Sequence, residues 1–280
     1  MFIKMERSKT PMLWFSLFFL VILCSFSIPI LAQEVDDERD FDYVKGSKRG
    51  PEHWGELRPA WAKCKTGEMQ SPIDLLHRRV KLTPKSEEIT RFYKPGKAIL
   101  KNRGHDIEVE WKDESSKIQI NGTDYILQQS HWLSPSEHTI NGKRYDMEVH
   151  IVHQSKDGKI AVIGRLYKIG KPNKFLKKLE KQIKLISDTT LEIDVGIVNP
   201  AKIKMRGKRF YRYTGSLTTP PCTEGVIWSV NTQIGTVSKN QVDMLREAVH
   251  DHAEKNARPL QRIHGRKVNL YAHMIKNRHD

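Results

Sequence analysis

Two histidines lie in stretches that are typical of β-strands and are spaced so that their side chains can meet. Residues 128–139 contain His131 and residues 146–153 contain His150. If these strands pair across the turn at Asn141-Gly142, the two imidazoles face each other. Converging imidazoles are zinc ligands in many proteins, but histidines on strands are also common as ordinary hydrogen-bonded residues. The spacing alone leaves both interpretations open.

The neighbours of each histidine favour the metal hypothesis. Alternate residues of a strand share one face, so Gln129 lies beside His131 and Glu148 lies beside His150. Amide and carboxylate groups in such positions orient the imidazoles of metal sites.

The elements that must position these histidines are mostly short strands separated by turn residues. Asn121-Gly122 and Asn141-Gly142 are both typical of hairpin turns. Amphipathic helices are predicted at residues 175–186 and 239–249. The pattern predicts a single, mainly β domain with a few peripheral helices. Strands are expected at residues 98–101, 106–111, 117–120, 125–132, 144–153 and 160–169.

The N-terminus has the pattern of a secretory signal peptide, predicted over residues 1–32. Basic residues precede an apolar run at 12–31, which ends at Ala32 before an acidic segment. A membrane anchor is the alternative, but serines and Pro29 interrupt the run. No second apolar span follows, so we expect no membrane association after cleavage. A polar segment is expected at 33–50, the folded domain at 51–275 and a tail at 276–280.

The overall composition is that of a globular protein with a basic surface. Of 280 residues, 38% are hydrophobic and 29% charged, and the formal charge is +15. Such a charge can attract nucleic acid, acidic polymers or anionic membranes. However, Lys and Arg are spread along the chain, and the densest run, at 174–184, has the spacing of an exposed helix face. We therefore expect a solvated basic surface and no nucleic-acid partner.

Cysteine usage agrees with export. Cys24 would leave with the signal peptide, which leaves Cys64 and Cys222. In an oxidising compartment such a pair favours a disulfide, and two free buried thiols are the alternative. Asn121 begins an Asn-Gly-Thr sequon and is a candidate glycosylation site.

A third stretch makes a specific resemblance visible. Residues 213–223 (YTGSLTTPPCT), together with 128–139, 146–153, 67–74 (GEMQSPID) and 256–259 (NARP), resemble the signature segments of α-carbonic anhydrases, in the order found in that family. The resemblance covers about residues 51–272 and is greatest to plant members of the secretory pathway. Those members reach the cell exterior, or the plastid by the secretory route.

The resemblance implies a large, twisted, mostly antiparallel sheet and a zinc ion held by three histidines. Zinc-bound hydroxide would attack carbon dioxide to give bicarbonate. Oligomeric state does not follow from the resemblance.

The resemblance also assigns roles to individual residues. His131 and His150 match zinc ligands, and Gln129, Glu148 and Asn256 match residues that support them. Thr218 and Glu137 match the pair that orients the hydroxide, and His105 matches the proton shuttle. Cys64 and Cys222 match a family disulfide that braces the Thr218 loop. The carbon dioxide pocket is expected to consist of Val152, Val162, Leu217, Thr219 and Trp228.

The sequence departs from the family pattern at one expected zinc ligand. The family has His-x-His where this chain reads His131-Trp132-Leu133. Leucine donates no lone pair and brings apolar surface beside a divalent ion. Four-ligand zinc sites are worth about 10–16 kcal/mol, so one ligand accounts for roughly 3–4 kcal/mol, or about a hundred- to thousand-fold in affinity. His138 and His153 are near in sequence but are not expected to substitute.

Arg165 is a second departure, because it interrupts an apolar run where the family has an aliphatic residue.

Three functional hypotheses follow. The first is a carbonic anhydrase (a zinc lyase) with impaired zinc affinity and low activity, using carbon dioxide and bicarbonate. The second is an inactive relative that serves in binding or storage. The third and weakest is a basic module that binds acidic polysaccharide.

Overall fold

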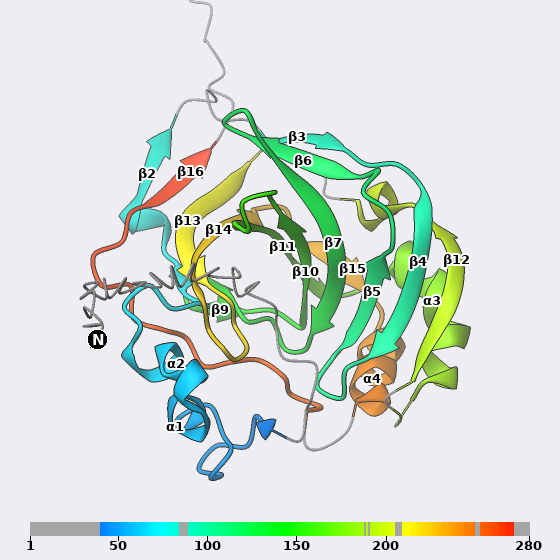
Figure 1. The fold of residues 1–280 in the computed structure, drawn as a ribbon, viewed down its shortest axis with the longest axis horizontal. Coiled ribbons are helices and arrows are strands. Elements are labelled where there is room, and N and C mark those ends of the chain that lie inside the picture. Colours follow the sequence, from blue (N-terminus) through cyan, green and yellow to red (C-terminus); the bar gives the residue numbers. More distant parts are fainter. Residues whose placement is uncertain are drawn as a thin grey trace, which may run out of the picture. The chain divides into compact units, whose positions relative to one another are not determined.

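The structure is a computed structural model that describes residues 40–83, 89–187, 189, 191–204, 209–249 and 253–271. The predicted signal peptide and the predicted tail lie outside these residues. Within the described residues, the chain forms one sheet of 13 strands and a small sheet of three strands (Figure 1). The prediction of a single, mainly β domain with a few helices is confirmed.

The elements follow one another along the chain as short strands with helices at the periphery. The small sheet contains β1 (Asp74–Leu75), β8 (Thr139–Ile140) and β9 (Lys143–Arg144). The helices are α1 (Trp54–Leu57), α2 (Lys63–Thr66), α3 (Lys174–Leu185) and α4 (Lys239–Ala248), with 3-10 turns η2 (Pro59–Trp61), η3 (His77–Arg79) and η4 (Pro200–Ile203). The large sheet contains β2 (Val80–Thr83), β3 (Ile89–Phe92), β4 (Gly96–Asn102), β5 (Ile107–Trp111), β6 (Lys117–Ile120), β7 (Thr123–Leu133), β10 (Met147–Gln154), β11 (Ile160–Ile169), β12 (Glu192–Val198), β13 (Phe210–Ser216), β14 (Glu224–Asn231), β15 (Gly235–Val237) and β16 (Val268–Tyr271).

The middle of the large sheet carries the two histidines. Its strand order is β12-β4-β5-β7-β10-β11-β14-β13-β16-β2, and β7 pairs with β10 in antiparallel orientation. In that register His131 lies directly opposite His150, as the sequence predicted. Most neighbours in this sheet are antiparallel, whereas β11 is parallel to β14 and β15, and β16 is parallel to β2.

One detail of the predicted hairpin is wrong. The Asn141-Gly142 turn joins β8 and β9 of the small sheet and does not connect β7 directly to β10. Both turn residues have positive φ, 50° and 75°, which suits Asn and Gly. The expected strand at 144–153 is accordingly interrupted after Arg144 and resumes at Met147.

The two faces of the large sheet bury different material. On one face, α3 packs its apolar side (Phe175, Leu176, Leu179 and Ile183) into the larger hydrophobic cluster. The opposite face carries the histidines and a second cluster that includes Trp228. α3 and α4 therefore support the sheet on one face, and the candidate site lies on the other.

Packing extends upstream of Pro51. Phe41 is buried, and its ring lies 5.2 Å from that of Trp54 and 6.2 Å from that of Trp61. Asp42, in the segment expected to be merely polar, is also buried.

Among the described residues, no helix is long and apolar enough to cross a membrane.

Arg165 lies on the helix-covered face of the sheet and does not line the site. It is opposite Val149 on β10, whereas its neighbour Gly164 is opposite His150. Its guanidinium donates to the carbonyl of Lys204 and lies over the Tyr167 ring, 5.3 Å from the ring centre. These contacts reduce the cost of burying its charge.

His153 also faces away from the site, and it makes stability depend on pH. Its Nδ1 lies 3.2 Å from the carbonyl of Ala161 and its Nε2 lies 2.8 Å from the hydroxyl of Tyr93. Burial lowers the pKa of His153 to about 3, so the folded protein keeps this imidazole neutral. The unfolded chain takes up a proton near pH 6.5, and stability is therefore lost as pH falls from about 6.5 towards 3.

We expect His153→Gln to flatten this acid dependence, because glutamine does not titrate. Burial raises the pKa of Glu137 to about 7, which acts in the opposite direction over part of this range. The readout is therefore the difference between variant and native protein in free energy of unfolding, measured by urea titration from pH 7 to pH 4.5. A difference that stays constant with pH would contradict the assignment.

Candidate metal site

The candidate metal site is built on two neighbouring strands, β7 and β10. His131 and His150 are 2% and 1% exposed, and their ring centres lie 5.1 Å apart. Nε2 of His131 is 3.2 Å from Nδ1 of His150. The sheet register thus brings one nitrogen of each ring to the same point.

Each imidazole is oriented through its other nitrogen. Nδ1 of His131 lies 2.9 Å from Oε1 of Gln129, and Nε2 of His150 lies 3.1 Å from Oε1 of Glu148. Because both oxygens are acceptors, each of these ring nitrogens carries the proton and donates it. The lone pairs of His131 Nε2 and His150 Nδ1 then point at each other. Two facing lone pairs repel unless a proton or a metal ion lies between them.

The spacing fits zinc. Zinc–nitrogen bonds are about 2.0–2.1 Å long, and tetrahedral geometry then puts two ligand nitrogens roughly 3.3–3.4 Å apart. The observed 3.2 Å is close to that value. Two of the donors that a zinc ion needs are therefore present and aligned.

Leu133 occupies the next position on the same face of β7. It is 1% exposed and lies opposite Glu148, two pairs along the register from His131 and His150. At the position where the family resemblance predicts a third donor, its side chain offers only hydrocarbon. Two of the three predicted positions therefore carry residues that fit zinc, and Leu133 does not.

A second cluster of possible ligand atoms, His138, Glu148 and His150, is better explained as a hydrogen-bond network. Glu148 accepts from the backbone N–H of His138 at 2.8 Å and from Nδ1 of His138 at 2.8 Å. Nε2 of His138 is in turn 2.7 Å from the hydroxyl of Tyr213. Burial raises the pKa of the Glu148 carboxyl, but the electrostatic effect of His138 and hydrogen bonds from His138 and His150 hold it below its usual range. Both ring nitrogens of His138 are engaged, so His138 does not act as a replacement ligand.

Close packing around Glu148 explains a glycine on β11. Gly164 lies opposite His150, and a Cβ added to Gly164 would come within 3.0 Å of Oε1 of Glu148. A larger residue would displace the carboxylate that orients His150.

Glu137 and Thr218 lie together beside His150. Glu137 is fully buried, and one carboxylate oxygen is 4.0 Å from Nε2 of His150. The other accepts from the backbone N–H of Arg258 at 2.9 Å. Burial raises the pKa of Glu137, while His150, the Thr218 hydroxyl and the Arg258 N–H oppose the rise. The sequence-predicted pair is therefore in contact.

The apolar residues expected around carbon dioxide also come together. Val152, Val162, Leu217 and Trp228 belong to one buried cluster, and the Trp228 ring lies 4.7 Å from that of His150. Thr219 is buried nearby in sequence, in the turn after Thr218. The structure thus places an apolar wall directly beside one histidine.

His105 is enclosed rather than open to solvent. It is 2% exposed and its ring centre lies 5.1 Å from that of Phe41. Its carbonyl accepts from the side chain of Asn256 at 2.7 Å, and Asn256 also accepts from the N–H of Ser134. A residue that hands protons to water must reach it, so this burial weighs against the shuttle role, which stays a prediction.

An ionic cluster beside His131 was not predicted from the sequence. Arg103 donates to both carboxylate oxygens of Asp106, at 2.8 and 2.5 Å, and lies 3.2 Å from Glu108. Glu108 is opposite His131 in the register of β5 and β7. Alternation of side chains along β5 could have predicted that Glu108 lies on the site face. The contact between Glu108 and Arg103, which comes from the preceding turn, could be found only from the structure.

Arg258 ties the signature segments together, and its role was also missed. Its guanidinium, 1% exposed, donates to Oε1 of Gln70 and to the carbonyl of Ser71 at 2.8 Å, and to the carbonyl of Cys64 at 3.1 Å. Cys64 is disulfide-bonded to Cys222, as expected. The N–H of Cys222 donates to the carbonyl of Thr219, so the disulfide holds the Thr218 loop.

A large twisted sheet with two aligned imidazoles, a buried glutamate–threonine pair and an apolar wall defines the carbonic anhydrase class of zinc lyases. The chain matches the model of eukaryotic-type carbonic anhydrase over residues 49–272 and belongs to that family, which is zinc-dependent.

Relatives agree in sequence and in fold. The chain is 47% identical to alpha carbonic anhydrase 7 of Arabidopsis thaliana over 92% of this chain and 97% of that protein. It is 50% identical to carbonic anhydrase Nec1 of Nesocodon mauritianus over 93% of this chain and 95% of that protein. Among solved structures, dioscorin complexed with ascorbate matches with a TM-score of 0.81 and 41% identity, over 84% of this chain and 99% of that one. A hyperthermostable carbonic anhydrase from a hydrothermal vent chimney matches with a TM-score of 0.76 and 35% identity, over 83% of this chain and 100% of that one.

Proposed function

We propose that this protein catalyses the reversible hydration of carbon dioxide at a zinc site whose metal affinity is impaired by Leu133. The observation that carries the proposal is the 3.2 Å approach of His131 Nε2 and His150 Nδ1, each oriented by a buried acceptor. Carbonic anhydrases are themselves the reference case for this chemistry, in which zinc lowers the pKa of bound water to about 7 and so supplies a nucleophile.

The remaining residues have roles that do not depend on Leu133. The Thr218 hydroxyl, in contact with the Glu137 carboxylate, is placed to orient the nucleophile through a hydrogen bond. Val152, Val162, Leu217 and Trp228 exclude water and offer an apolar surface to carbon dioxide. We propose His105 as the proton shuttle, a role that requires a movement exposing its buried ring to water.

The native protein tests the proposal through its zinc content and activity together. After purification without added metal we expect well under one zinc per chain, with the site filling as zinc is raised and the hydration rate rising in step. Elemental mass spectrometry and stopped-flow hydration assays provide both readouts. Hydration that persists unchanged in excess chelator would contradict a zinc mechanism.

A second candidate is a non-catalytic relative that serves in binding or storage. Leu133 at a ligand position favours it, and the structural neighbour dioscorin is described in complex with ascorbate. Failure to bind zinc at any concentration would favour this candidate, and ascorbate is the first ligand to test.

We also propose that the chain enters the secretory pathway, to the cell exterior or the plastid. The pattern of residues 1–32 and the Cys64–Cys222 disulfide support export, because disulfides persist in oxidising compartments. Asn121 lies in an exposed turn between β6 and β7, which suits glycosylation there.

A further inference from the structure

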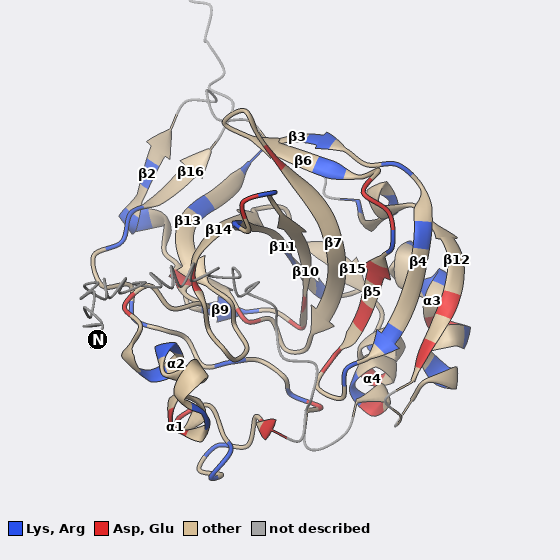
Figure 2. Ribbon diagram, viewed as in Figure 1, with Lys and Arg blue, Asp and Glu red and all other residues tan. Residues whose placement is uncertain are grey.

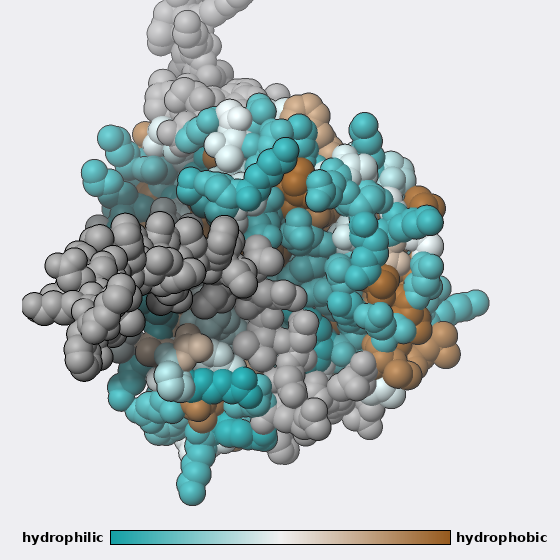
Figure 3. Space-filling model, viewed as in Figure 1, coloured by the Kyte–Doolittle hydropathy of each residue, from teal (hydrophilic) through white to brown (hydrophobic). Residues whose placement is uncertain are grey.

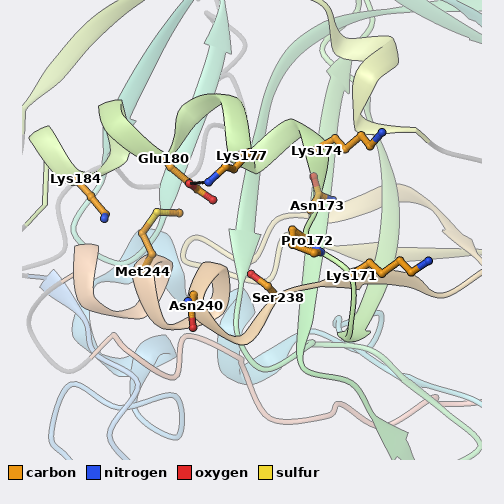
Figure 4. A pocket seen from close by; sticks show the side chains of 10 residues that line it. All are labelled: Lys171, Pro172, Asn173, Lys174, Lys177, Glu180, Lys184, Ser238, Asn240 and Met244. Atoms are coloured by element: carbon orange, nitrogen blue, oxygen red, sulfur yellow. Dashed lines mark hydrogen bonds and ion pairs between the residues drawn. The ribbon is translucent and has the colours of Figure 1, made fainter.

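A cavity between α3 and α4 lies on the helix-covered side of the sheet, away from the histidines. Its volume is about 670 Å³, and α3 forms one wall while the start of α4 forms the other (Figure 4). The lining residues of this groove on α3 run from Lys174 to Lys184, a span of about 15 Å along the helix axis. Its dimensions suit an extended ligand better than a single small ion.

The wall of this groove is strongly basic. Among its lining residues, four are lysines (Lys171, Lys174, Lys177 and Lys184) and one is acidic, Glu180. Lys177 pairs with Glu180 at 2.8 Å, so that carboxylate is already neutralised locally. Lys171 and Lys174 extend at one end of the groove, and Lys184 lies near Met244 at the other (Figure 4). Figure 2 shows the same concentration of positive charge along α3.

The charge in the groove comes from the lysines and not from the helix ends. Asn173 accepts from the first N–H groups of α3, and Ser238 accepts from the N–H of Gln241 at the start of α4. Gln241 also links the two helix starts, because its amide bonds the N–H and the carbonyl of Asn173. The backbone donors are thus used within the protein, and an anionic ligand would meet flexible ammonium groups.

The other lining residues indicate what kind of anion fits. Asn173 and Ser238 already accept hydrogen bonds from helix N–H groups, whereas Asn240 offers an amide that suits hydroxyl-rich ligands. Pro172 and Met244 offer apolar surface to a sugar ring. None of the lining residues is aromatic and none is arginine. Nucleic acids are usually held by base stacking on aromatic rings and by arginine forks on phosphate, so a nucleic acid fits this groove less well.

We propose that the groove between α3 and α4 binds an acidic oligosaccharide whose carboxylates pair with Lys171, Lys174 and Lys184. This site is separate from the metal site and is independent of zinc. Leu185 at the end of α3 and Ile197 on β12 are exposed apolar residues that do not line the groove. Most of the described surface on the face drawn in Figure 3 is hydrophilic.

The test is fluorescence anisotropy of the full chain with a labelled galacturonic acid decamer at physiological salt. Lys174→Gln combined with Lys184→Gln is expected to weaken binding about three- to tenfold, since exposed ion pairs are individually weak. The control variant combines Lys168→Gln with Lys178→Gln and removes the same charge from exposed positions outside the groove. We expect it to lose less than about twofold in affinity for the decamer. Thermal melting checks that both variants remain folded.

Four results would overturn the proposal. One is equal loss of affinity in the two double variants, which would show diffuse attraction to a basic surface. Another is tighter binding of single-stranded DNA of equal charge than of the galacturonic acid decamer. The third is that the native protein does not bind the decamer, and the fourth is that neutral galactan competes as well as unlabelled polygalacturonate.

Discussion

Replacement of Leu133 by histidine is expected to tighten zinc binding by about 100- to 1000-fold, because it restores one donor of roughly 3–4 kcal/mol. Leu133 already lies on the site face of β7, two residue pairs from His131 and His150. The leucine and histidine side chains are similar in size, so the fold should tolerate the exchange. Competition with a chromophoric chelator measures the affinity, and stopped-flow assays should show a large gain in hydration rate.

Two control variants separate the effect of adding a metal-binding donor from the effect of making room at position 133. Leu133→Ala opens room for a water ligand without adding a protein donor, and we expect it to recover only a small part of the affinity. Leu133→His combined with His131→Leu keeps the number of histidines but again removes one donor, so it should remain weak. A native protein that hydrates carbon dioxide as fast as Leu133→His would show that Leu133 does not impair the site.

Loss of the Cys64–Cys222 disulfide is expected to destabilise the fold by about 3–5 kcal/mol. The two cysteines are 158 residues apart, and chain-entropy arguments give about 5 kcal/mol for a loop of that length, near the upper end of measured effects. The double variant Cys64→Ala, Cys222→Ala compared with native protein in guanidinium chloride gives the difference. Cys222 has a positive φ of 55°, and alanine carries the same backbone strain, so the comparison isolates the cross-link.

The disulfide also acts on the Thr218 loop. In the double variant we expect the hydration rate to fall more than zinc affinity, because the loop and not the histidines loses its brace. A change below about 1 kcal/mol in unfolding free energy, with unchanged activity, would show that hydrogen bonds of Arg258 hold this region without the disulfide.

Much of this architecture could be predicted because its cause is local. The strands at 117–120 and 160–169 have alternating or continuous apolar patterns bounded by turns, and they coincide with β6 and β11. The meeting of His131 and His150 followed from strand alternation once the two strands were assumed to pair. The identity of Leu133 was visible in the sequence itself.

Long-range polar contacts could not be predicted in the same way. The bonds of His138 to Glu148 and Tyr213, and those of Arg258 to Gln70 and Ser71, join segments with no periodic signal. The contact of Arg165 with the carbonyl of Lys204 is of the same kind. Three-dimensional packing around a buried charge determines such contacts. Neither the composition nor the spacing of residues in the sequence predicts them.

The parallel pairing of β2 with β16 has a consequence for how the protein is made. Strand β2 (Val80–Thr83) cannot pair until its partner β16 (Val268–Tyr271), almost at the other end of the described chain, has been synthesised. During synthesis from the N-terminus, β13 therefore has an uncovered edge until residue 271 has left the ribosome. β2 thus stays unpaired, and the neighbouring apolar cluster unfinished, for about two-thirds of translation, which makes chaperone protection most valuable just before the last strand emerges.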